Sequence, residues 1–240
     1  MKITLLGTGD AIGTPKVGCS CPQCTRAKAE GTPRLRTSLL VENHGRHLLI
    51  DSSPDLRAQL LRAGSPHIDA VIWTHGHYDH FIGFGEFYRI QKIPPVFAAP
   101  QVLNYCAEIF RFLTFDKGAI QPYEPFAIFG ITITPFIVKH PPAFTCGMLF
   151  DTGKSRVAYT SDTNIDIPEQ SLDLLTGLDL LLLDALVPSD VSIHKHMNYL
   201  DACTLAEHLA PKDFRCVHMS HMLPWDLPHT GKDGDIFEFP

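Results

Sequence analysis

The chain has 240 residues, 45% of them hydrophobic and 19% charged, which excludes a disordered chain and suffices for a full hydrophobic core. Its 20 basic and 26 acidic side chains leave a formal net charge of −6. This balance argues against a dedicated nucleic-acid binder, because such proteins carry a basic surplus. Histidine is the outlier in the composition, and 13 histidines call for a search for clustered metal ligands.

Apolar runs and helical periodicity predict the secondary structure in chain order. Strands dominate the first and middle thirds, and helices lie between them without strict alternation. No internal repeat, low-complexity stretch or linker divides the sequence. We therefore expect an α+β protein, a single αββα sandwich over residues 1–240 with two sheets inside and helices outside. The predicted strands span residues 3–6, 38–41, 47–50, 70–73, 96–98, 131–138, 146–150, 157–160, 180–183 and 216–218, and the predicted helices span residues 54–63, 100–112, 168–175 and 199–209.

The sequence predicts neither a secretory nor a membrane segment. The N-terminus lacks the long apolar stretch and the small-residue cleavage site of a signal peptide. The longest apolar run, residues 178–187, is interrupted by Asp179 and Asp184 and is too short to span a bilayer. We expect a cytoplasmic protein that does not enter a membrane.

Three histidines and a carboxylate lie within six residues directly after an apolar strand: His75, His77, Asp79 and His80. Imidazole and carboxylate groups are ligands for zinc, manganese and iron. A buried strand fixes the start of this loop, as a preorganised site requires. The H-x-H-x-D-H pattern therefore predicts a metal centre, and the alternative is a polar surface loop.

Four side chains cannot complete the ligand sets of two metal ions, so the rest of the chain must supply others. His140, Asp162 and His218 each come at the end of a predicted strand, and loops at strand ends are where catalytic ligands usually project. Each could by itself be a capping or surface residue, but together they supply the missing ligands. Two cations lower the pKa of a shared water and offset charge on a phosphoryl or acyl group, so the cluster predicts hydrolysis.

The ligand series resembles that of the metallo-β-lactamase superfamily, whose fold is an αββα sandwich with the metals at one edge of the sheets. The resemblance implies two divalent cations, zinc or manganese. Aspartate at position 162, where the lactamases proper have cysteine, favours the phosphodiesterase-type branches. The implied ligand groups share Asp162: one comprises His75, His77 and His140, and the other comprises Asp79, His80 and His218.

Three cysteines at C-x-C-x-x-C spacing, Cys19, Cys21 and Cys24, predict a second kind of metal site in the loop 19–24. Without a secretion signal, such crowding indicates metal binding rather than disulfides. A closed tetrahedral zinc site needs a fourth ligand, and we expect His221, three residues after His218, to supply it. The alternative is a set of reduced surface thiols. The remaining cysteines lie in apolar runs and are predicted core residues: Cys106, Cys146, Cys203 and Cys216.

The cysteine loop, together with a histidine three residues after the last predicted ligand, resembles the PhnP-type phosphodiesterases, cyclic phosphate hydrolases associated with carbon–phosphorus lyase. Phosphodiester cleavage needs a proton donor for the leaving alkoxide, and both His194 and His196 are candidates. The resemblance assigns this role to His196, 22 residues before His218. We expect Asp184 to hold the His196 ring, with an ordinary strand-terminal aspartate as the alternative. The implied catalytic set is thus His196, Asp184 and the metal ligand Asp79.

The leading functional prediction is a phosphodiesterase for a small, linear or cyclic diester, and the resemblance implies 5-phosphoribosyl 1,2-cyclic phosphate as the family substrate. A tRNA 3′-processing endonuclease is an alternative, but it needs a basic arm to hold RNA, and residues 110–126 carry few charges. A protein like coenzyme PQQ synthesis protein B is a further alternative with a related cysteine loop. A non-enzymatic zinc module would leave the histidine cluster unexplained. Relatives often dimerise, so the resemblance also leaves a homodimer open.

Three further features have weaker interpretations. Asp51 ends a predicted strand and is expected to orient a metal ligand from behind. Gly7-Thr8-Gly9 predicts a tight turn near the metal edge, since the third glycine of a dinucleotide motif is missing. Arg34 and Arg36 are interpreted as solvated surface charges, with contact to a phosphate as the alternative.

Overall fold

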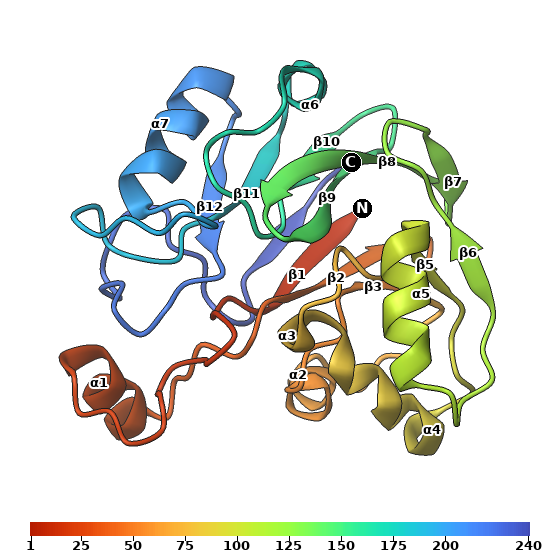
Figure 1. Ribbon diagram of the computed structural model, residues 1–240, viewed down its shortest axis with the longest axis horizontal. Coiled ribbons are helices and arrows are strands. Elements are labelled where there is room, and N and C mark those ends of the chain that lie inside the picture. Colours follow the sequence, from red (N-terminus) through yellow and green to blue (C-terminus); the bar gives the residue numbers. More distant parts are fainter.

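The computed structural model describes all 240 residues and contains two mixed β-sheets that face each other, with helices on their outer sides (Figure 1). This arrangement confirms the predicted αββα sandwich. The first sheet has seven strands in the order β13-β1-β2-β3-β4-β5-β6, and the second has six in the order β12-β11-β10-β9-β8-β7. None of the helices combines the length and the apolar character that a bilayer crossing requires.

Each sheet has an antiparallel part and a parallel part. In the first sheet, the strands from β3 to β6 are parallel, and in the second, the strands from β10 to β12 are parallel. Parallel strands all end at the same edge, so the residues that follow them meet there. The first sheet consists of β1 (Lys2–Gly7), β2 (Ser38–Asn43), β3 (Arg46–Ile50), β4 (Ala70–Ile72), β5 (Val96–Ala98), β6 (Lys117–Ala119) and β13 (Ile236–Glu238). The second consists of β7 (Phe126–Ile128), β8 (Ile131–His140), β9 (Ala143–Asp151), β10 (Arg156–Tyr159), β11 (Leu180–Asp184) and β12 (Phe214–Val217).

The apolar strand β11 shows how the layers are held together. Leu180 and Leu182 belong to the core between the two sheets, whereas Leu181 and Leu183 belong to a second cluster with the buried side of α7. Successive side chains of a strand point to opposite faces, so an unbroken leucine run fills both cores. The strand is therefore fixed on both faces, and its last residue, Asp184, is held rigidly at the edge.

The helices differ from the predicted ones mainly at their ends. The predicted helices 54–63, 100–112 and 168–175 are shorter in the structure, and 199–209 has the predicted length. The short strands β6, β7 and β13 and the helices α1, α3 and α4 were not predicted. The helices are α1 (Pro22–Glu30), α2 (Leu56–Arg62), α3 (Tyr78–Phe81), α4 (Phe87–Ile90), α5 (Pro100–Ile109), α6 (Glu169–Leu174) and α7 (Tyr199–Leu209), with a 3₁₀ helix, η1, at Ile82–Glu86.

Helix α1 escaped prediction because its sequence, PQCTRAKAE, is polar and has no apolar stripe. Its start is set locally instead. Pro22 occupies the first turn, and the Cys21 sulfur accepts a hydrogen bond from the backbone N–H of Cys24. The helix ends at Gly31, whose φ of 66° is left-handed. In Figure 1, α1 stands apart from the sandwich at the end of a long loop.

Candidate metal centres

The predicted ligands converge at the edge where the parallel strands of both sheets end. His75 follows β4, Asp162 follows β10, His218 follows β12, and His140 is the last residue of β8. Asp79 and His80 lie in the single-turn helix α3 rather than in an open loop. The structure places all seven predicted ligands in two groups, each with donor atoms within 4.8 Å of one another: His75, His77, His140 and Asp162, and Asp79, His80, His218 and Asp162.

The donor atoms of the first group surround one point. His140 Nε2 lies 2.9 Å from His77 Nδ1. Asp162 Oδ2 lies 3.6 Å from His75 Nε2 and 3.7 Å from His140 Nε2. Ligands at about 2.1 Å from a tetrahedral zinc ion are about 3.4 Å from one another. The spacing therefore fits a divalent cation.

The second group has the same spacing. Asp79 Oδ2 lies 3.2 Å from His80 Nε2 and 3.4 Å from His218 Nε2. Asp162 contributes both of its oxygens, with Oδ1 at 3.4 Å from His80 Nε2 and Oδ2 at 3.3 Å from His218 Nε2. A carboxylate shared by both groups can bridge two cations.

Several of these donor atoms are buried and lack any hydrogen-bond partner in the chain, among them His75 Nε2, His80 Nε2 and Asp162 Oδ1. An unsatisfied buried polar atom costs about 1–3 kcal/mol, so folded proteins rarely leave several of them side by side. Bound cations would satisfy these atoms. The residues present thus fit a pair of divalent metal ions.

Hydrogen bonds to the ring nitrogens that face away from the ligand cluster fix the orientation of the ligand rings. Asp51 accepts from His80 Nδ1 at 2.7 Å and from the backbone N–H and hydroxyl of Thr74, both at 2.8 Å. His140 Nδ1 donates to the carbonyl of Lys195 at 3.0 Å. Such partners set the tautomer, leaving Nε2 free to face the metal. Thr74 and the Lys195 carbonyl carried no signal in the sequence, because neither belongs to a ligand motif.

The carboxylates of the cluster keep protons on two of its rings. Burial opposes the charged forms of His80 and His218, but Asp162 and Asp79 outweigh it. The pKa of His80 is raised well above its usual range, and that of His218 is raised to about 9. Burial lowers the pKa of His140 to about 4. A cation that binds next to His80 and His218 would have to displace their protons.

The backbone is strained at the same edge. Asp51, Ser161 and His218 have φ values of 60°, 57° and 56°, a left-handed region that side chains other than glycine rarely adopt. Asp51 and His218 directly follow β3 and β12, and Ser161 lies two residues after the end of β10, so all three are next to or within the ligand cluster. Strain of this kind concentrates at functional sites, where the surrounding fold holds it in place.

The three cysteines of the loop 19–24 meet His221, as a second, separate group of donor atoms. The His221 Nδ1 atom lies 3.6 Å from Cys19 Sγ and 3.4 Å from Cys21 Sγ. Zinc–sulfur and zinc–nitrogen bonds of about 2.3 and 2.1 Å place such atoms about 3.6 Å apart. Burial raises the pKa of Cys24 to about 11, so a bound cation is what would hold that sulfur as a thiolate. Cys106, Cys146 and Cys216 are buried as predicted, and Cys203 is partly exposed.

The interpretation of Arg34 as a surface charge is wrong. Its side chain is buried and donates to the carbonyls of Ser220, Leu223 and Pro224 at 3.0, 2.9 and 3.3 Å, and its guanidinium stacks on Trp225. These carbonyls belong to the segment that follows His218, so Arg34 holds the segment that carries both His218 and His221. Sequence reasoning missed this because the partners are backbone atoms far along the chain.

The predicted tight turn at Gly7-Thr8-Gly9 is not formed, because Gly7 ends strand β1 and Gly9 continues it with isolated β-bridges to Arg36 and Met219. This extended segment packs against residues 34–36 too closely for side chains at the two glycines. A Cβ at Gly7 would lie 2.1 Å from the Arg36 carbonyl oxygen, and one at Gly9 would lie 2.7 Å from that of Arg34. Asp233 receives the N–H and hydroxyl of Thr8 at 2.9 and 2.8 Å. The motif serves close backbone packing beside the metal edge.

His196 lies at the rim of the metal cluster with Asp184 behind it. Asp184 Oδ2 accepts from His196 Nδ1 at 2.7 Å. The His196 ring stacks on that of His218, with centroids 5.1 Å apart and planes 11° apart, and it lies 4.6 Å from the ring of His140. Asp184 is fully buried, whereas His196 is only partly so. His194 is exposed, and it is absent from every donor group.

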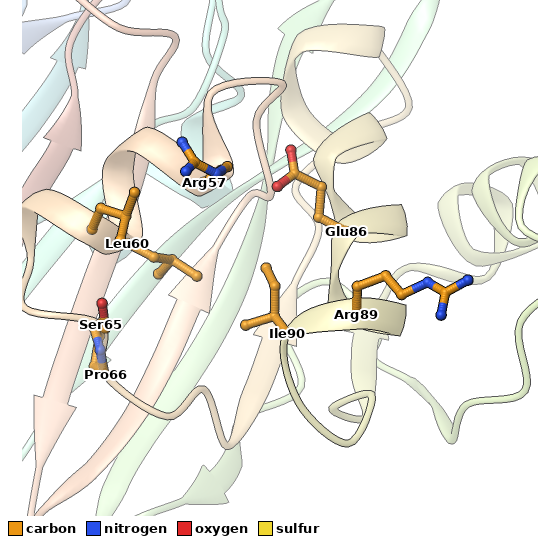
Figure 2. Close-up of a pocket in the computed structure, with 8 residues that line it drawn as sticks. Arg57, Leu60, Ser65, Pro66, Glu86, Arg89 and Ile90 are labelled. Atoms are coloured by element: carbon orange, nitrogen blue, oxygen red, sulfur yellow. The ribbon is translucent and has the colours of Figure 1, made fainter.

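A cavity of about 420 Å³ between α2 and α4 is separate from these centres (Figure 2). Leu60 and Ile90 form its apolar part, and Arg57 and Glu86 supply charge. None of the residues that line it belongs to a donor group. The metal chemistry therefore belongs to the strand edge and not to this cavity.

Comparison with known proteins places this site in a family. Residues 46–219 match the model of the beta-lactamase superfamily domain. A solved structure of a diphosphatase from the PhnP family superposes with a TM-score of 0.90 and 31% identity, covering 100% of this chain and 98% of that one. Coenzyme PQQ synthesis protein B of Methylobacterium radiotolerans is 30% identical over 79% of this chain and 74% of its own length.

A third relative is longer than this chain. The octanoyltransferase of Porphyromonas gingivalis is 29% identical over 98% of this chain, but the match covers 51% of that protein. The chain thus spans about half of the length of this relative. The family model, the sandwich and the similarity to the PhnP-family structure agree. The chain belongs to the metallo-β-lactamase superfamily, as a PhnP-type member of it.

Proposed function

We propose that the protein is a metal-dependent phosphodiesterase that hydrolyses a small phosphodiester. In this proposal, the two groups that share Asp162 hold two divalent cations, zinc or manganese, and the cysteine loop with His221 holds a structural zinc ion. The nitrogen and oxygen donors of the two groups that share Asp162 suit either metal, whereas the thiolates of the cysteine loop favour zinc. Bound cations would supply a water of lowered pKa and offset negative charge on the phosphate.

The observation that carries the proposal is the position of the His196 imidazole, at the rim of the ligand cluster with Asp184 behind it. His196 lies against the rings of His140 and His218, one from each ligand group. From there, it can give a proton to the alkoxide that leaves a phosphate held at the cluster. The hydrogen bond to Asp184 fixes the orientation of the ring. Hydrolysis of esters with poor leaving groups needs such an acid.

The family resemblance makes a small cyclic ester such as 5-phosphoribosyl 1,2-cyclic phosphate a candidate substrate. A tRNA 3′-processing endonuclease is less well supported, because it needs a basic surface for the RNA backbone. Between Phe110 and Phe126, Arg111 and Lys117 are balanced by two acidic residues, and the segment contains the sheet strand β6. A role like that of PQQ synthesis protein B is compatible with the same metal ligands and differs in activity.

Two measurements test the proposal: the metal content of the protein and its activity on a generic diester. The purified protein should contain about three metal ions per chain, two catalytic and one structural. It should hydrolyse bis-p-nitrophenyl phosphate, and the Asp162→Ala variant should lose both activity and catalytic metal. A protein that holds all of its metals but does not cleave this or any cyclic or linear diester would overturn the proposal and favour a PQQ-synthesis-like role.

A further inference from the structure

A cavity of about 320 Å³ opens directly beside the metal ligand His77. It lies between the start of α5 and the turn that joins β8 to β9. Cavities of this size hold small organic groups. Its lining is mainly apolar and includes Gly76, Val102, Tyr105, Pro142 and Phe144, with Gln101 as the polar side chain apart from His77.

One wall of the cavity is an aromatic ring fixed in position. A Cβ at Gly76 would lie 2.7 Å from Cδ1 of Tyr105, so the ring approaches the ligand loop only because residue 76 is glycine. Phe81 packs edge-on against the same ring, with centroids 6.1 Å apart. Even so, 58% of Tyr105 is exposed. A ring that is packed on one side and exposed on the other, beside the ligand cluster, can serve as a stacking platform.

The other wall consists of Pro142 and Phe144, from the β8–β9 turn. Gln101, on the rim, is exposed, and its side-chain amide is open to solvent. Its amide has a donor and an acceptor side by side. Two apolar walls and a free amide match the faces and the polar edge of a planar heteroaromatic ring.

The position of the cavity relative to the acid identifies the part of the substrate that it accepts. His140 contacts His77, with 2.9 Å between ring nitrogens, and also His196, with ring centroids 4.6 Å apart. His140 thus contacts both His77, which lines the cavity, and His196, which does not. The leaving alkoxide must reach His196, so the cavity faces the substituent that stays on the phosphate.

We propose that this cavity binds a planar aromatic group, such as a nucleobase, on the part of the diester that remains esterified after cleavage. Tyr105 stacks on the ring, and Gln101 bonds to its polar edge. This inference rests on the proposed phosphodiesterase function and adds the substrate class to it. The substrates are then nucleoside or aryl phosphodiesters rather than purely aliphatic ones.

The test compares three diesters with the same leaving group: thymidine 5′-p-nitrophenyl phosphate, phenyl p-nitrophenyl phosphate and methyl p-nitrophenyl phosphate. Stacking of one base contributes about 1–3 kcal/mol. We therefore expect kcat/KM to be about tenfold higher for the thymidine ester than for the methyl ester, a difference of about 1.4 kcal/mol. Tyr105→Ala should remove this preference, so that the thymidine and methyl esters are cleaved at similar rates, and Tyr105→Phe should keep it.

Two controls separate the parts of the proposal. Tyr88→Ala removes a tyrosine of α4 that is 55% exposed and outside the cavity, and it should change nothing. Gln101→Ala should lower kcat/KM for the thymidine ester but not for the phenyl ester, because only the base has a polar edge. An equal loss of kcat/KM for both esters would show that Gln101 does not recognise the base.

The outcomes distinguish the cavity from the chemistry. If the methyl and thymidine esters are cleaved equally well, the cavity proposal is wrong and the phosphodiesterase proposal stands. If the metal-loaded protein cleaves neither, the function proposal fails, and calorimetric binding of thymidine 5′-monophosphate and methyl phosphate still decides the cavity. Equal affinities for these two ligands, or an affinity that Tyr105→Ala leaves intact, would overturn it.

Discussion

Replacing Asp184 by asparagine tests the proton donor while leaving its geometry in place. Asp184 Oδ2 accepts two hydrogen bonds, from His196 Nδ1 at 2.7 Å and from the N–H of Thr163 at 2.9 Å. Its Oδ1 has no hydrogen-bond partner and lies 3.8 Å from His218 Nδ1. An asparagine can thus keep its amide oxygen in the Oδ2 position and satisfy both donors. What Asp184→Asn removes is the negative charge.

The size of the effect follows from that difference. Hydrogen bonds to a charged group contribute about 1.5–3 kcal/mol and neutral ones about 0.5–1.5 kcal/mol. The loss of about 1–1.5 kcal/mol should lower kcat about tenfold for a diester with an alkyl leaving group. Asp184→Ala removes the whole hydrogen bond that holds His196, so we expect a larger loss of kcat, about 100-fold. It also leaves the buried Thr163 N–H unsatisfied, which should lower stability.

The assay is the dependence of kcat on the leaving group. Methyl and p-nitrophenyl leaving groups are compared in the wild type, Asp184→Asn, His196→Ala and the double variant. An acid matters most for the poor leaving group, so both single variants should slow methanol release more than p-nitrophenol release. In the His196→Ala background, Asp184→Asn should have no further effect, because the ring that it holds is gone.

Three results would refute this reasoning. Unchanged kcat in Asp184→Asn alongside a severe loss in His196→Ala would show that the pair does not act together. Equal slowing of both leaving groups would show that no proton transfer is affected. Loss of metal from Asp184→Asn would show that the carboxylate acts through the nearby His218 instead.

Two further predictions concern the metals. Cys21→Ser should lower the total metal content from about three to about two ions per chain, through loss of the structural zinc, and should reduce the thermal midpoint, while the pair of catalytic ions stays bound at low temperature. Cys203→Ser, outside the loop, is the matched control, and equal loss of all metals would contradict the independence of the two sites. Mn²⁺ affinity, followed by electron paramagnetic resonance, should rise from pH 6 to about pH 9, because the raised pKa values of His80 and His218 leave protons that the cation must displace. A flat pH profile would show that these rings are already deprotonated.

The residues that the sequence determined by itself are those close together along the chain. His75, His77, Asp79 and His80 lie within six residues after a strand, and the three cysteines lie within six residues of one loop. Short spacing limits how far such side chains can separate, so their clustering survives any arrangement of the remaining chain. The apolar strands could also be predicted from the sequence, because burial on one or both faces leaves a periodic pattern of apolar residues.

Contacts between distant segments depended on the tertiary structure. Asp162 meets His75 and His80 only because β10 and β4, from opposite sheets, end at the same edge. The family resemblance, rather than spacing, anticipated that meeting. The Thr74, Ser161 and Lys195 contacts were not anticipated at all, since hydroxyl and carbonyl groups occur everywhere in a sequence.

The same reason explains the errors and the omissions. Arg34 looked like a surface charge, but the carbonyl groups that bury it follow His218, almost 190 residues away. The position of Tyr105 could not be predicted from the sequence, because it depends on how α5 packs against the loop at Gly76. Local spacing identified the metal ligands of each loop, whereas the packing of two sheets decided how they combine and what lies beside them.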